Sequence, residues 1–323
     1  MEKKFNSNEW KRDEYLSKIS HLYYKEGLKQ TFIAEKFNIS APTVSRLIQE
    51  ALDRGIVEII IRYPSSTVPN LEEKLVEQLH LKDAYVLEKQ NRNYENLVAD
   101  VSQKAALVLE DYLKDGMKLG ISLGMAVAAT AKAFNPKKRM RCPVARLQGA
   151  NENELQEGTD LAQIFSTRLG GEFSNIPSPW IMKKKEARDM ILKEPTVDIA
   201  MEIAEKSDIA LVGIGTMEPS VSTMVRNRLL TERELILLRK SGVVGEICGK
   251  HYDANGNLVD VDINDRTVSI DIRHLRRIDP VIGVAASVHK AEAILGAIQG
   301  NFIDVLVTDA SAAQKILELQ NKK

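Results

Sequence analysis

The stretch "VIGVAASVHKAEAILGAIQGNFIDVLVTD", residues 281–309, contains one complete strand–helix–strand unit. Its apolar runs at 281–284 and 305–308 have the length and composition of buried strands, and the amphipathic segment 288–298 between them predicts a helix. Two strands that are joined through such a helix lie parallel in one sheet. The stretch therefore predicts an α/β fold for the part of the chain around it.

The same alternation continues through most of the chain. We expect further strands at 84–87, 117–121, 143–147 and 209–214, and further helices at 94–113, 125–134, 158–169, 231–240 and 310–319. Short apolar strands that alternate with amphipathic helices are typical of a doubly wound, mostly parallel sheet. Asn255-Gly256 interrupts this alternation and predicts a hairpin turn.

The first 64 residues follow a different pattern, which predicts a small all-α unit. Two helices are expected at 11–26 and 30–37, with Phe32, Ile33 and Phe37 pointing inward. A third helix is expected to begin after the N-cap Ser40 and to run to about residue 54.

The boundary between the two patterns follows from composition. The β-branched segment 56–64 predicts a strand, 65–70 reads as a linker, and a helix is expected at about 70–80. We therefore expect two domains, residues 1–64 and residues 65–323.

Composition restricts the classes of function. The formal net charge is +0, and residues 1–63 carry 11 Lys/Arg against 9 Asp/Glu, so any contact with DNA must depend on a few well-placed side chains. Cys142 and Cys248 are far apart and lack the spacing of metal ligands, so we expect reduced thiols and no metal site. The chain shows no apolar signal segment and no run of 18 apolar residues, which predicts a soluble, cytoplasmic protein with no membrane contact.

Residues 30–46 have the pattern of a helix-turn-helix. A tight turn precedes a helix whose first residues are small and polar, and such a helix can sink into a major groove. Hydroxyl groups there reach base edges or phosphates, and Arg46 can reach guanine or the backbone. The alternative is a helical hairpin that serves only packing or dimerisation. The predicted contacts with double-stranded operator DNA are Gln30, Thr31, Ser40, Ala41, Pro42, Thr43, Ser45 and Arg46.

Four loops follow the ends of predicted strands, where open α/β sheets bind ligands. They offer a hydroxyl beside a glycine turn, amides, and a lysine near a helix start, a combination that suits a phosphate or sugar hydroxyls. Taken singly, each loop is also explained as an ordinary turn, a solvated loop or a surface lysine. Together they predict one cleft for a phosphorylated sugar or a polyol, and the dinucleotide fingerprint Gly-x-Gly-x-x-Gly is absent from the sequence. The residues concerned are Ser122, Gln148, Gly149, Asn151, Gly215, Thr216 and Lys290.

The segments "FIAEKFNISAPTVSRLI", "GISLGMAV", "LQGA", "DIALVGIGT", "GVVGEICGKHYDANGN" and "VIGVAASVHKAEAILGAIQG" carry a resemblance that covers most of the chain. In this order they resemble the SorC family of sugar-responsive transcription regulators. The resemblance implies an effector domain similar to sugar-phosphate isomerases and glucosamine-phosphate deaminases, and usually a tetramer. The effector contacts that it implies are Ser122, Gly124, Met125, Gln148, Gly149, Gly215, Thr216, Glu246 and Lys290.

Several positions depart from the family pattern. Met125-Ala126 and Ala285-Ala286 stand where many members have threonines and glycines, and Gln148 stands where some carry a cation. Gln148 has no charge and cannot form an imine with an aldehyde. We therefore expect a sugar monophosphate, or an unphosphorylated sugar or polyol, and no other cofactor.

Two other classes of function remain open at this point. A sugar-phosphate isomerase or deaminase with an accessory helical head needs an acid/base pair, for which Glu246 with Asp160, His251 or His289 is the candidate. A pure interaction protein with a degenerate cleft is the third possibility. The favoured interpretation is a regulator of a carbohydrate catabolic operon that is not an enzyme and acts as a homo-oligomer, a dimer or a tetramer.

Overall fold

The computed structural model describes residues 7–57, 66–88, 93–150 and 160–322. The chain divides into two compact units, Met1–Tyr63 and Pro64–Lys323. The strand predicted for 56–64 falls mostly outside the described residues. None of the helices in the described ranges is long and apolar enough to cross a membrane.

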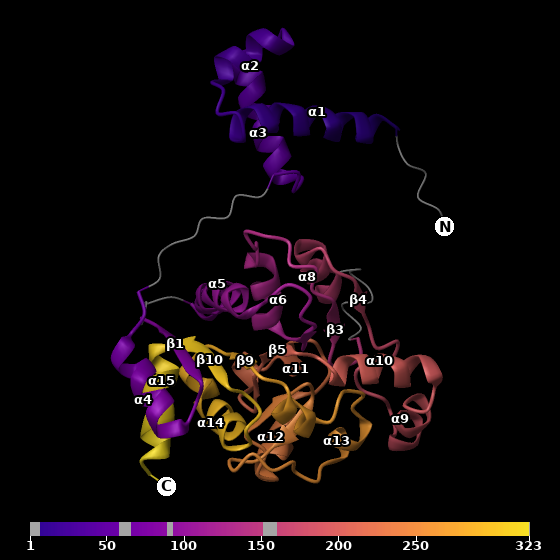
Figure 1. Cartoon of the computed structure of the whole chain (residues 1–323), viewed down its shortest axis with the longest axis vertical. Helices are drawn as coiled ribbons and strands as arrows, with labels where there is room; N and C mark the ends of the chain where they lie inside the picture. Colours follow the sequence, from indigo (N-terminus) through magenta and orange to yellow (C-terminus); the bar gives the residue numbers. More distant parts are fainter. Residues whose placement is uncertain (1–6, 58–65, 89–92, 151–159, 323) are drawn as a thin grey trace. The chain divides into compact units, whose positions relative to one another are not determined.

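Three helices form the N-terminal unit: α1 (Ser7–Tyr24), α2 (Gln30–Phe37) and α3 (Ala41–Asp53), drawn in indigo and violet in Figure 1. They pack around fully buried apolar side chains that include Leu16, Ile19, Ile33 and Val44. Asn38 takes a left-handed conformation, with φ 52°, and ends α2. The predicted helix pair and its tight turn are therefore confirmed.

Phe32 does not point inward as predicted, because 54% of it is exposed. The buried face of α2 is centred on Ile33 and Ala34. Since successive helical residues are turned by about 100° around the axis, Phe32 lies on the opposite side of the helix from the middle of that face. Phe37 is only half-buried and meets Tyr15 edge to face.

A seven-stranded sheet, parallel throughout, forms the centre of the C-terminal unit. The strand order is β1-β10-β9-β5-β2-β3-β4. The strands are β1 (Asp83–Leu87), β2 (Leu119–Ile121), β3 (Val144–Arg146), β4 (Phe173–Ser174), β5 (Ile209–Gly213), β9 (Val281–Val284) and β10 (Val305–Asp309). The predicted doubly wound α/β fold is confirmed.

Helices cover both faces of this sheet (Figure 1). One face packs against α5 (Tyr94–Tyr112), α6 (Met125–Ala133) and α8 (Leu161–Leu169). The other packs against α4 (Pro69–Leu79), α14 (Ala291–Gln299) and α15 (Ala310–Gln320). Burial on both faces explains why the strands read as continuous apolar runs and not as alternating patterns.

The strand order reverses between β2 and β5. From β2 the chain moves outward to β3 and β4, and it then returns to β5 on the other side of β2 before it continues to β9 and β10. In open α/β sheets, the carboxyl ends of the strands at such a reversal form the usual place for a ligand. The site is therefore expected just after Ile121 and Gly213.

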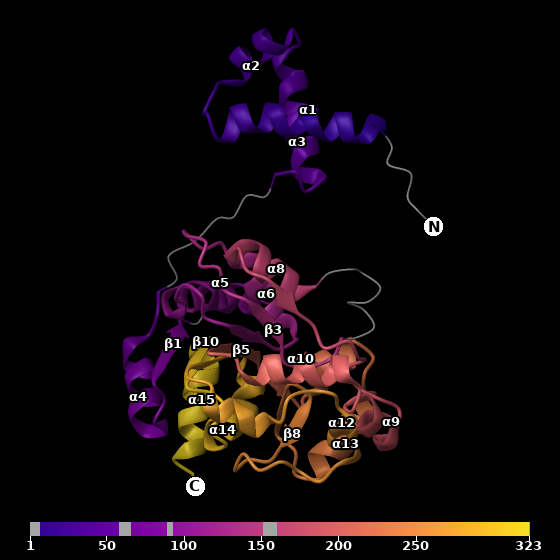
Figure 2. The ribbon, with the colours of Figure 1, turned by 45° about the vertical axis from the view of Figure 1, so that its right-hand side comes forward.

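A small antiparallel sheet adds a second layer beside the main one, with β6 (Gly215–Thr216), β7 (Gly245–Ile247) and β8 (Lys250–Tyr252) in sequence order. The turn of its β7–β8 hairpin lies at Cys248-Gly249, where both residues have positive φ. Asn255-Gly256 lies in a second turn, between Tyr252 and Leu258, which form an antiparallel bridge, so the predicted hairpin turn is confirmed. Figure 2 shows β8 with α12 (Glu232–Lys240) and α13 (Asp262–Arg266) on the same side of the main sheet.

Candidate functional site

The first group of predicted effector residues lies at the reversal of the strand order. Ser122 follows β2 directly and is completely buried, and its Oγ accepts a hydrogen bond from the backbone N–H of Gly213 at 2.9 Å. The same hydroxyl donates to the carbonyl of Leu123 at 3.3 Å. Ser122 therefore joins the ends of β2 and β5 and sets the position of the turn into α6.

Gln148 follows β3 and is also completely buried. Its Oε1 accepts from the backbone N–H of Leu123 at 3.3 Å, so the orientation of the amide is fixed. Its Nε2 is a buried donor that has no hydrogen-bond partner. Because a buried donor without a partner costs free energy, a ligand oxygen at this position would satisfy it.

Gly149 is required by the close approach of another loop. A Cβ at this position would lie 2.6 Å from the carbonyl oxygens of both Ser178 and Pro179. The adjacent Ala150 exchanges backbone hydrogen bonds with that loop, at 2.9 Å to Ser178 and 2.8 Å from Trp180. The predicted contact Asn151 lies outside the described residues.

Glu246 and Gly215 lie opposite each other, as paired residues of the antiparallel strands β7 and β6. The carboxyl group of Glu246 lies over Gly215, where a Cβ would be 2.0 Å from Oε1, so any side chain larger than hydrogen would displace it. Its Oε2 accepts from the backbone N–H of Gly249 at 2.8 Å. Burial raises the pKa of Glu246, while the Gly249 N–H and the charge of Lys290 act against that rise.

Lys290 is buried, although a lysine near a helix start is more often a surface residue. Only 6% of it is exposed, and its Nζ donates to the carbonyl of Ile214 at 2.6 Å. Burial lowers the pKa of Lys290 to about 8, the carboxylate of Glu246 acts in the opposite direction, and Arg226 lowers it further. The cation and the carboxylate of Glu246 thus stabilise each other's charged forms in the interior.

The turn that carries Lys290 contains a strained residue. Ser287 has φ 94° and ψ 140°, a backbone conformation that residues with a Cβ rarely adopt. Two hydrogen bonds hold it there: its N–H donates to Asp309 Oδ2 at 2.5 Å, and its Oγ accepts from the N–H of His289 at 3.4 Å. Asp309 also caps α15, so one carboxylate fixes the geometry of both loops.

Arg226 is a candidate contact that the sequence analysis missed. It ends α11 (Thr223–Arg226), and its guanidinium lies 3.7 Å from Sδ of Met125, the first residue of α6. It also stacks over the ring of Tyr94, with 5.4 Å between Cζ and the ring centroid, and lies 3.8 Å from Glu95. Because Gly124 precedes α6 in an open position with φ 143°, this helix start and Arg226 together favour an anion.

Other predicted residues have structural partners. The hydroxyl of Thr216 donates to the carbonyl of His289 at 3.0 Å and accepts from the N–H of Glu218. The carboxylate of Asp160 caps α8 and also accepts a hydrogen bond from the side chain of Asn175, so both of its oxygens have structural partners. Of the two histidines, His289 is exposed, whereas His251 is fully buried and burial lowers its pKa to about 4. In the described ranges, no group of three or more His, Cys, Asp or Glu could hold a metal ion.

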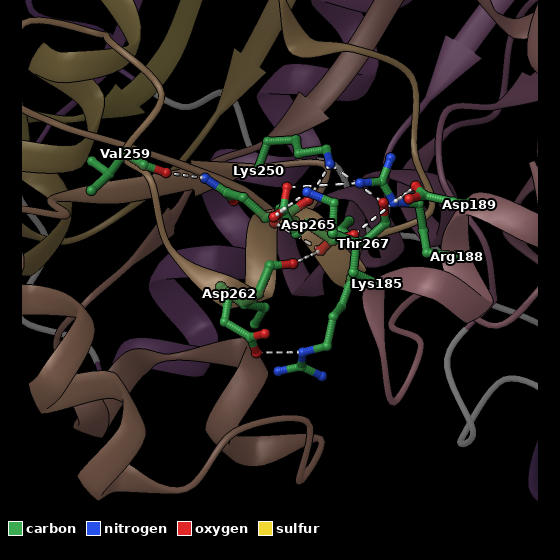
Figure 3. Close-up of polar contacts among 12 residues, drawn as sticks. Lys185, Arg188, Asp189, Lys250, Val259, Asp262, Asp265 and Thr267 are labelled. Atoms are coloured by element: carbon green, nitrogen blue, oxygen red, sulfur yellow. Dashed lines mark hydrogen bonds and ion pairs between the residues drawn. The ribbon is translucent and has the colours of Figure 1, made fainter.

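A polar network holds the β7–β8 hairpin, which carries Glu246, in place (Figure 3). Lys250 donates to the carbonyls of Asn264 at 2.6 Å and Thr267 at 3.3 Å, and burial lowers its pKa to about 8. The side chain of Asn264 in turn accepts from the N–H of His251 and donates to its carbonyl. The hairpin is thereby joined to α13 and to the segment after it.

The same network reaches a helix that the sequence analysis did not predict, α9 (Lys185–Ile191). Asp265 on α13 pairs with Lys185 at 2.9 Å, and its backbone carbonyl accepts from Arg188 at 2.6 Å. Arg266, the last residue of α13, donates to the carbonyl of Met182 at 2.9 Å. These bonds connect the β7–β8 hairpin, through α13, to α9 and to the segment before α9.

The start of α3 is the second candidate site. Ser40 caps the helix by accepting from the N–H of Thr43 at 3.3 Å, and their hydroxyls lie 2.8 Å apart. Arg46 is exposed, 3.5 Å from the Thr43 hydroxyl, and Ser45 and Pro42 are exposed beside it. The remaining predicted contacts are exposed or half-buried on the same unit, namely Gln30, Thr31 and Ala41.

Comparison with known proteins identifies the family. Residues 64–318 match the family model described as "Putative sugar-binding domain". The Deoxyribonucleoside regulator of Bacillus subtilis (strain 168) is 30% identical over 92% of this chain and 95% of its own length. The Sorbitol operon regulator of Klebsiella pneumoniae is 29% identical over 93% and 96% of the two chains. The crystal structure of the full-length Sorbitol Operon Regulator SorC from Klebsiella pneumoniae matches with a TM-score of 0.69 and 28% identity, over 95% of this chain and 99% of that one.

These relatives are transcriptional regulators and not enzymes, and their similarity extends through both units. The enzyme alternative is therefore set aside, in agreement with the structural roles of Asp160 and His251. The chain belongs to the SorC family of transcriptional regulators, and its C-terminal unit matches the domain described as "Putative sugar-binding domain".

Proposed function

We propose that this regulator controls a carbohydrate catabolic operon. In this proposal the N-terminal unit binds operator DNA, and a sugar, polyol or sugar phosphate in the C-terminal unit switches that binding. The relatives named Sorbitol operon regulator and Deoxyribonucleoside regulator support an effector of this kind. The residues of the candidate effector site support it independently.

One observation carries the effector proposal: a free donor and a buried cation come from the turns after β3 and β9, and a buried carboxyl group comes from β7. Gln148 offers Nε2 without a partner, Lys290 offers a charged Nζ, and Glu246 offers a carboxylate. A sugar presents hydroxyls that both donate and accept, so it can satisfy the amide and the carboxylate together. An apolar ligand would leave these groups unsatisfied, at a cost of about 1–3 kcal/mol each.

The cations favour a single phosphate on that sugar. Arg226 lies beside the first residue of α6, and Lys290 is close enough for each charge to affect the other. Together with the N–H groups at the start of α6, they provide positive potential for one dianionic group. The carboxylate of Glu246 opposes a second phosphate, so a bisphosphate fits this set of charges less well than a monophosphate.

The DNA-binding proposal rests on the start of α3. Ser40 to Arg46 present hydroxyls, a small side chain and one cation at a helix N-terminus, which suits contacts to phosphates and base edges in a major groove. Residues 1–63 carry an excess of only two positive charges, so one unit alone binds DNA weakly. We therefore propose that the protein acts in the cytoplasm as a homo-oligomer, a dimer or a tetramer, with two or more reading units on the operator.

The test is a binding assay with the promoter of the genes beside this one. Fluorescence anisotropy with that promoter fragment, with and without each compound of a panel of sugars, polyols and sugar phosphates, should identify one compound that changes operator affinity. The same compound should raise the melting temperature, because a ligand that binds only the folded state stabilises it. A protein that binds no promoter fragment, or whose operator affinity no carbohydrate changes, would contradict the proposal.

A further inference from the structure

The guanidinium of Arg226 reaches the start of α6 from a short helix whose backbone is fixed. Met224 in the same helix is buried, and the N–H of Asn227 donates to the carbonyl of Thr223 at 2.9 Å. The side chain of Arg226 beyond this anchor is 39% exposed. A long, exposed arginine side chain has many rotamers, and ordering it when a ligand binds costs free energy unless another group already restrains it.

Tyr94, the first residue of α5, has a fixed position beside that start. Asn93 caps α5 with its side chain, and the ring of Tyr94 packs against the apolar core on this face of the sheet. The buried hydroxyl of Ser102 donates to the carbonyl of Ala126 at 3.0 Å and so joins α5 to the first turn of α6, which lies beside it in Figures 1 and 2. Burial raises the pKa of Tyr94 to about 12, and the charge of Arg226 opposes that rise.

Arg226 is oriented by this ring without the use of most of its N–H donors. Its Cζ lies over the ring, 5.4 Å from the centroid, and attraction between a cation and an aromatic face needs no hydrogen bond. Nη1 lies 3.7 Å from Sδ of Met125, a weak acceptor, and 3.8 Å from Oε1 of Glu95, which is too far for a hydrogen bond. Within the described ranges, Nε and Nη2 make no hydrogen bond. The guanidinium therefore has a set orientation and donors available for a ligand.

Glu95 is the acidic partner that a ligand would have to replace. Its side chain is 76% exposed, and an ion pair between exposed side chains is weak because solvent screens it. A phosphate group carries up to two negative charges and can accept two parallel hydrogen bonds from one guanidinium. A phosphate at the start of α6 therefore binds Arg226 more strongly than Glu95 does.

We propose that Tyr94 is a positioning residue that orients Arg226 for the phosphate of the effector, and that Glu95 pairs with the same guanidinium until the phosphate replaces it. The inference rests on the proposed function and adds to it a way in which the site selects a phosphorylated compound. Effector binding exchanges one anion for another at a cation that is already in place. An unphosphorylated sugar has no anion with which to replace Glu95, so it gains nothing from this arrangement.

The experiment measures the binding of inorganic phosphate to the full-length protein. The apparent Kd is taken from the rise in melting temperature in potassium phosphate over that in potassium chloride of equal ionic strength. Tyr94→Leu should raise this Kd by about 2- to 30-fold, the range of a cation–π contact, whereas Tyr94→Phe, which keeps the aromatic ring, should stay within about twofold of the wild type. Glu95→Gln should lower the Kd by about 2- to 5-fold, because the competing anion is gone.

Two comparisons separate positioning from packing. Tyr85→Leu is the matched control, since Nζ of Lys104 on α5 lies 4.9 Å from the Tyr85 ring centroid but neither residue is a predicted effector contact. This variant should bind phosphate as the wild type does. In an Arg226→Ala background, Tyr94→Leu should change the Kd no further, because a residue that acts through Arg226 then has nothing to position. Each Kd comes from a rise in melting temperature, so a variant with a lower starting value remains informative.

The inference is overturned if phosphate and chloride have the same effect on the wild-type protein, or if Tyr94→Leu changes the Kd no more than Tyr85→Leu does. An equal effect of Tyr94→Leu with and without Arg226 also overturns it, and an unchanged or higher Kd of Glu95→Gln overturns the exchange with Glu95. Promoter binding, measured on the same samples, separates these results from the proposed function. A carbohydrate that changes promoter binding of a wild-type protein without a phosphate response removes only this inference. The expected phosphate response in a protein that binds no promoter removes only the proposed function.

Discussion

Replacing Lys290 by methionine should weaken effector binding while it stabilises the ligand-free protein. Methionine is close to lysine in length but has no charge, so it removes the cation with little change in packing. Loss of one charge-assisted hydrogen bond costs about 1.5–3 kcal/mol, which corresponds to about a 10- to 150-fold weaker affinity for a phosphorylated effector. The unphosphorylated counterpart of the same sugar should lose much less.

The stabilisation follows from the pKa of Lys290. Burial lowers it from 10.5 to about 8, and at about 1.4 kcal/mol per pKa unit the charged form is disfavoured by about 3.5 kcal/mol in the folded state. Methionine avoids this cost but leaves the carbonyl of Ile214 without its donor, which returns about 1–2 kcal/mol. We therefore expect a net stabilisation of about 1.5–2.5 kcal/mol at pH 7, visible as a higher melting temperature.

The same shift predicts a dependence on pH. Because the folded pKa lies below the unfolded value, the unfolded chain binds more protons between about pH 8 and pH 10.5. The contribution of this group to stability is therefore least favourable below pH 8 and becomes more favourable as the pH rises through that window. The Lys290→Met variant should lose this contribution, so its advantage over the wild type should shrink above pH 8.

Lys250→Met is the matched control, since burial also lowers the pKa of Lys250 to about 8 but its Nζ is bound to the carbonyls of Asn264 and Thr267 and is not a predicted effector contact. It should change the melting temperature, and any effect through the hairpin that carries Glu246 should weaken the phosphorylated compound and its unphosphorylated counterpart by the same factor. Isothermal titration with the phosphorylated effector and its unphosphorylated counterpart measures both variants. Wild-type affinity of Lys290→Met for the phosphorylated compound would refute the role assigned to Lys290.

Three further predictions concern the other parts of the site. Arg46→Ala should weaken operator binding by about 5- to 150-fold, because a base or phosphate contact contributes about 1–3 kcal/mol. The control Arg54→Ala removes the same charge from the end of α3, where it pairs with α1, and should bind nearly as the wild type. Equal operator affinities of the two variants in anisotropy assays would exclude Arg46 from the interface. Gly149→Ala should lower the free energy of unfolding by about 1–3 kcal/mol because its Cβ would meet two backbone carbonyls at 2.6 Å. The control Gly213→Ala, whose Cβ would have its nearest neighbours at 3.6 Å, should melt nearly as the wild type. Similar melting temperatures for both variants would show that the loop beside Gly149 can move aside. Arg226→Ala should lower the affinity for a phosphorylated effector more than the affinity for its unphosphorylated counterpart, as measured by titration calorimetry. An equal loss of affinity for both compounds would assign Arg226 to packing against Tyr94.

The α/β fold was predictable from the sequence because its signals are local. Strands that are buried on both faces need continuous apolar runs, and helices that cover a sheet need an apolar stripe, so both leave a periodic pattern within a dozen residues. Capping is equally local: Ser40 before α3 and Thr231 before α12 accept hydrogen bonds from the third helical residue, as side chains three residues apart can do. A helix without buried residues, such as α9, leaves no apolar stripe in the sequence and was not predicted.

The site was predictable only as a set of loops. Parallel strands place their carboxyl ends on one edge, which is why residues as distant in sequence as Ser122 and Lys290 could be assigned to one site before any coordinates. Their partners could not be assigned in that way. That Glu246 lies over Gly215 depends on the pairing of β6 with β7, and that Lys290 is buried depends on its bond to Ile214, 76 residues earlier in the chain.

The sequence by itself determined the strand–helix alternation of most of the main sheet, the helix start at Ser40 and the family resemblance, since each depends on short-range spacing. Tertiary structure alone decided the chemical state of the site. It left Nε2 of Gln148 free by binding Oε1, lowered the pKa of Lys290 by burial, and placed Arg226 beside Met125. Charge and hydrogen bonding in a protein interior depend on which groups are adjacent in space, and that adjacency arises only when distant segments pack together.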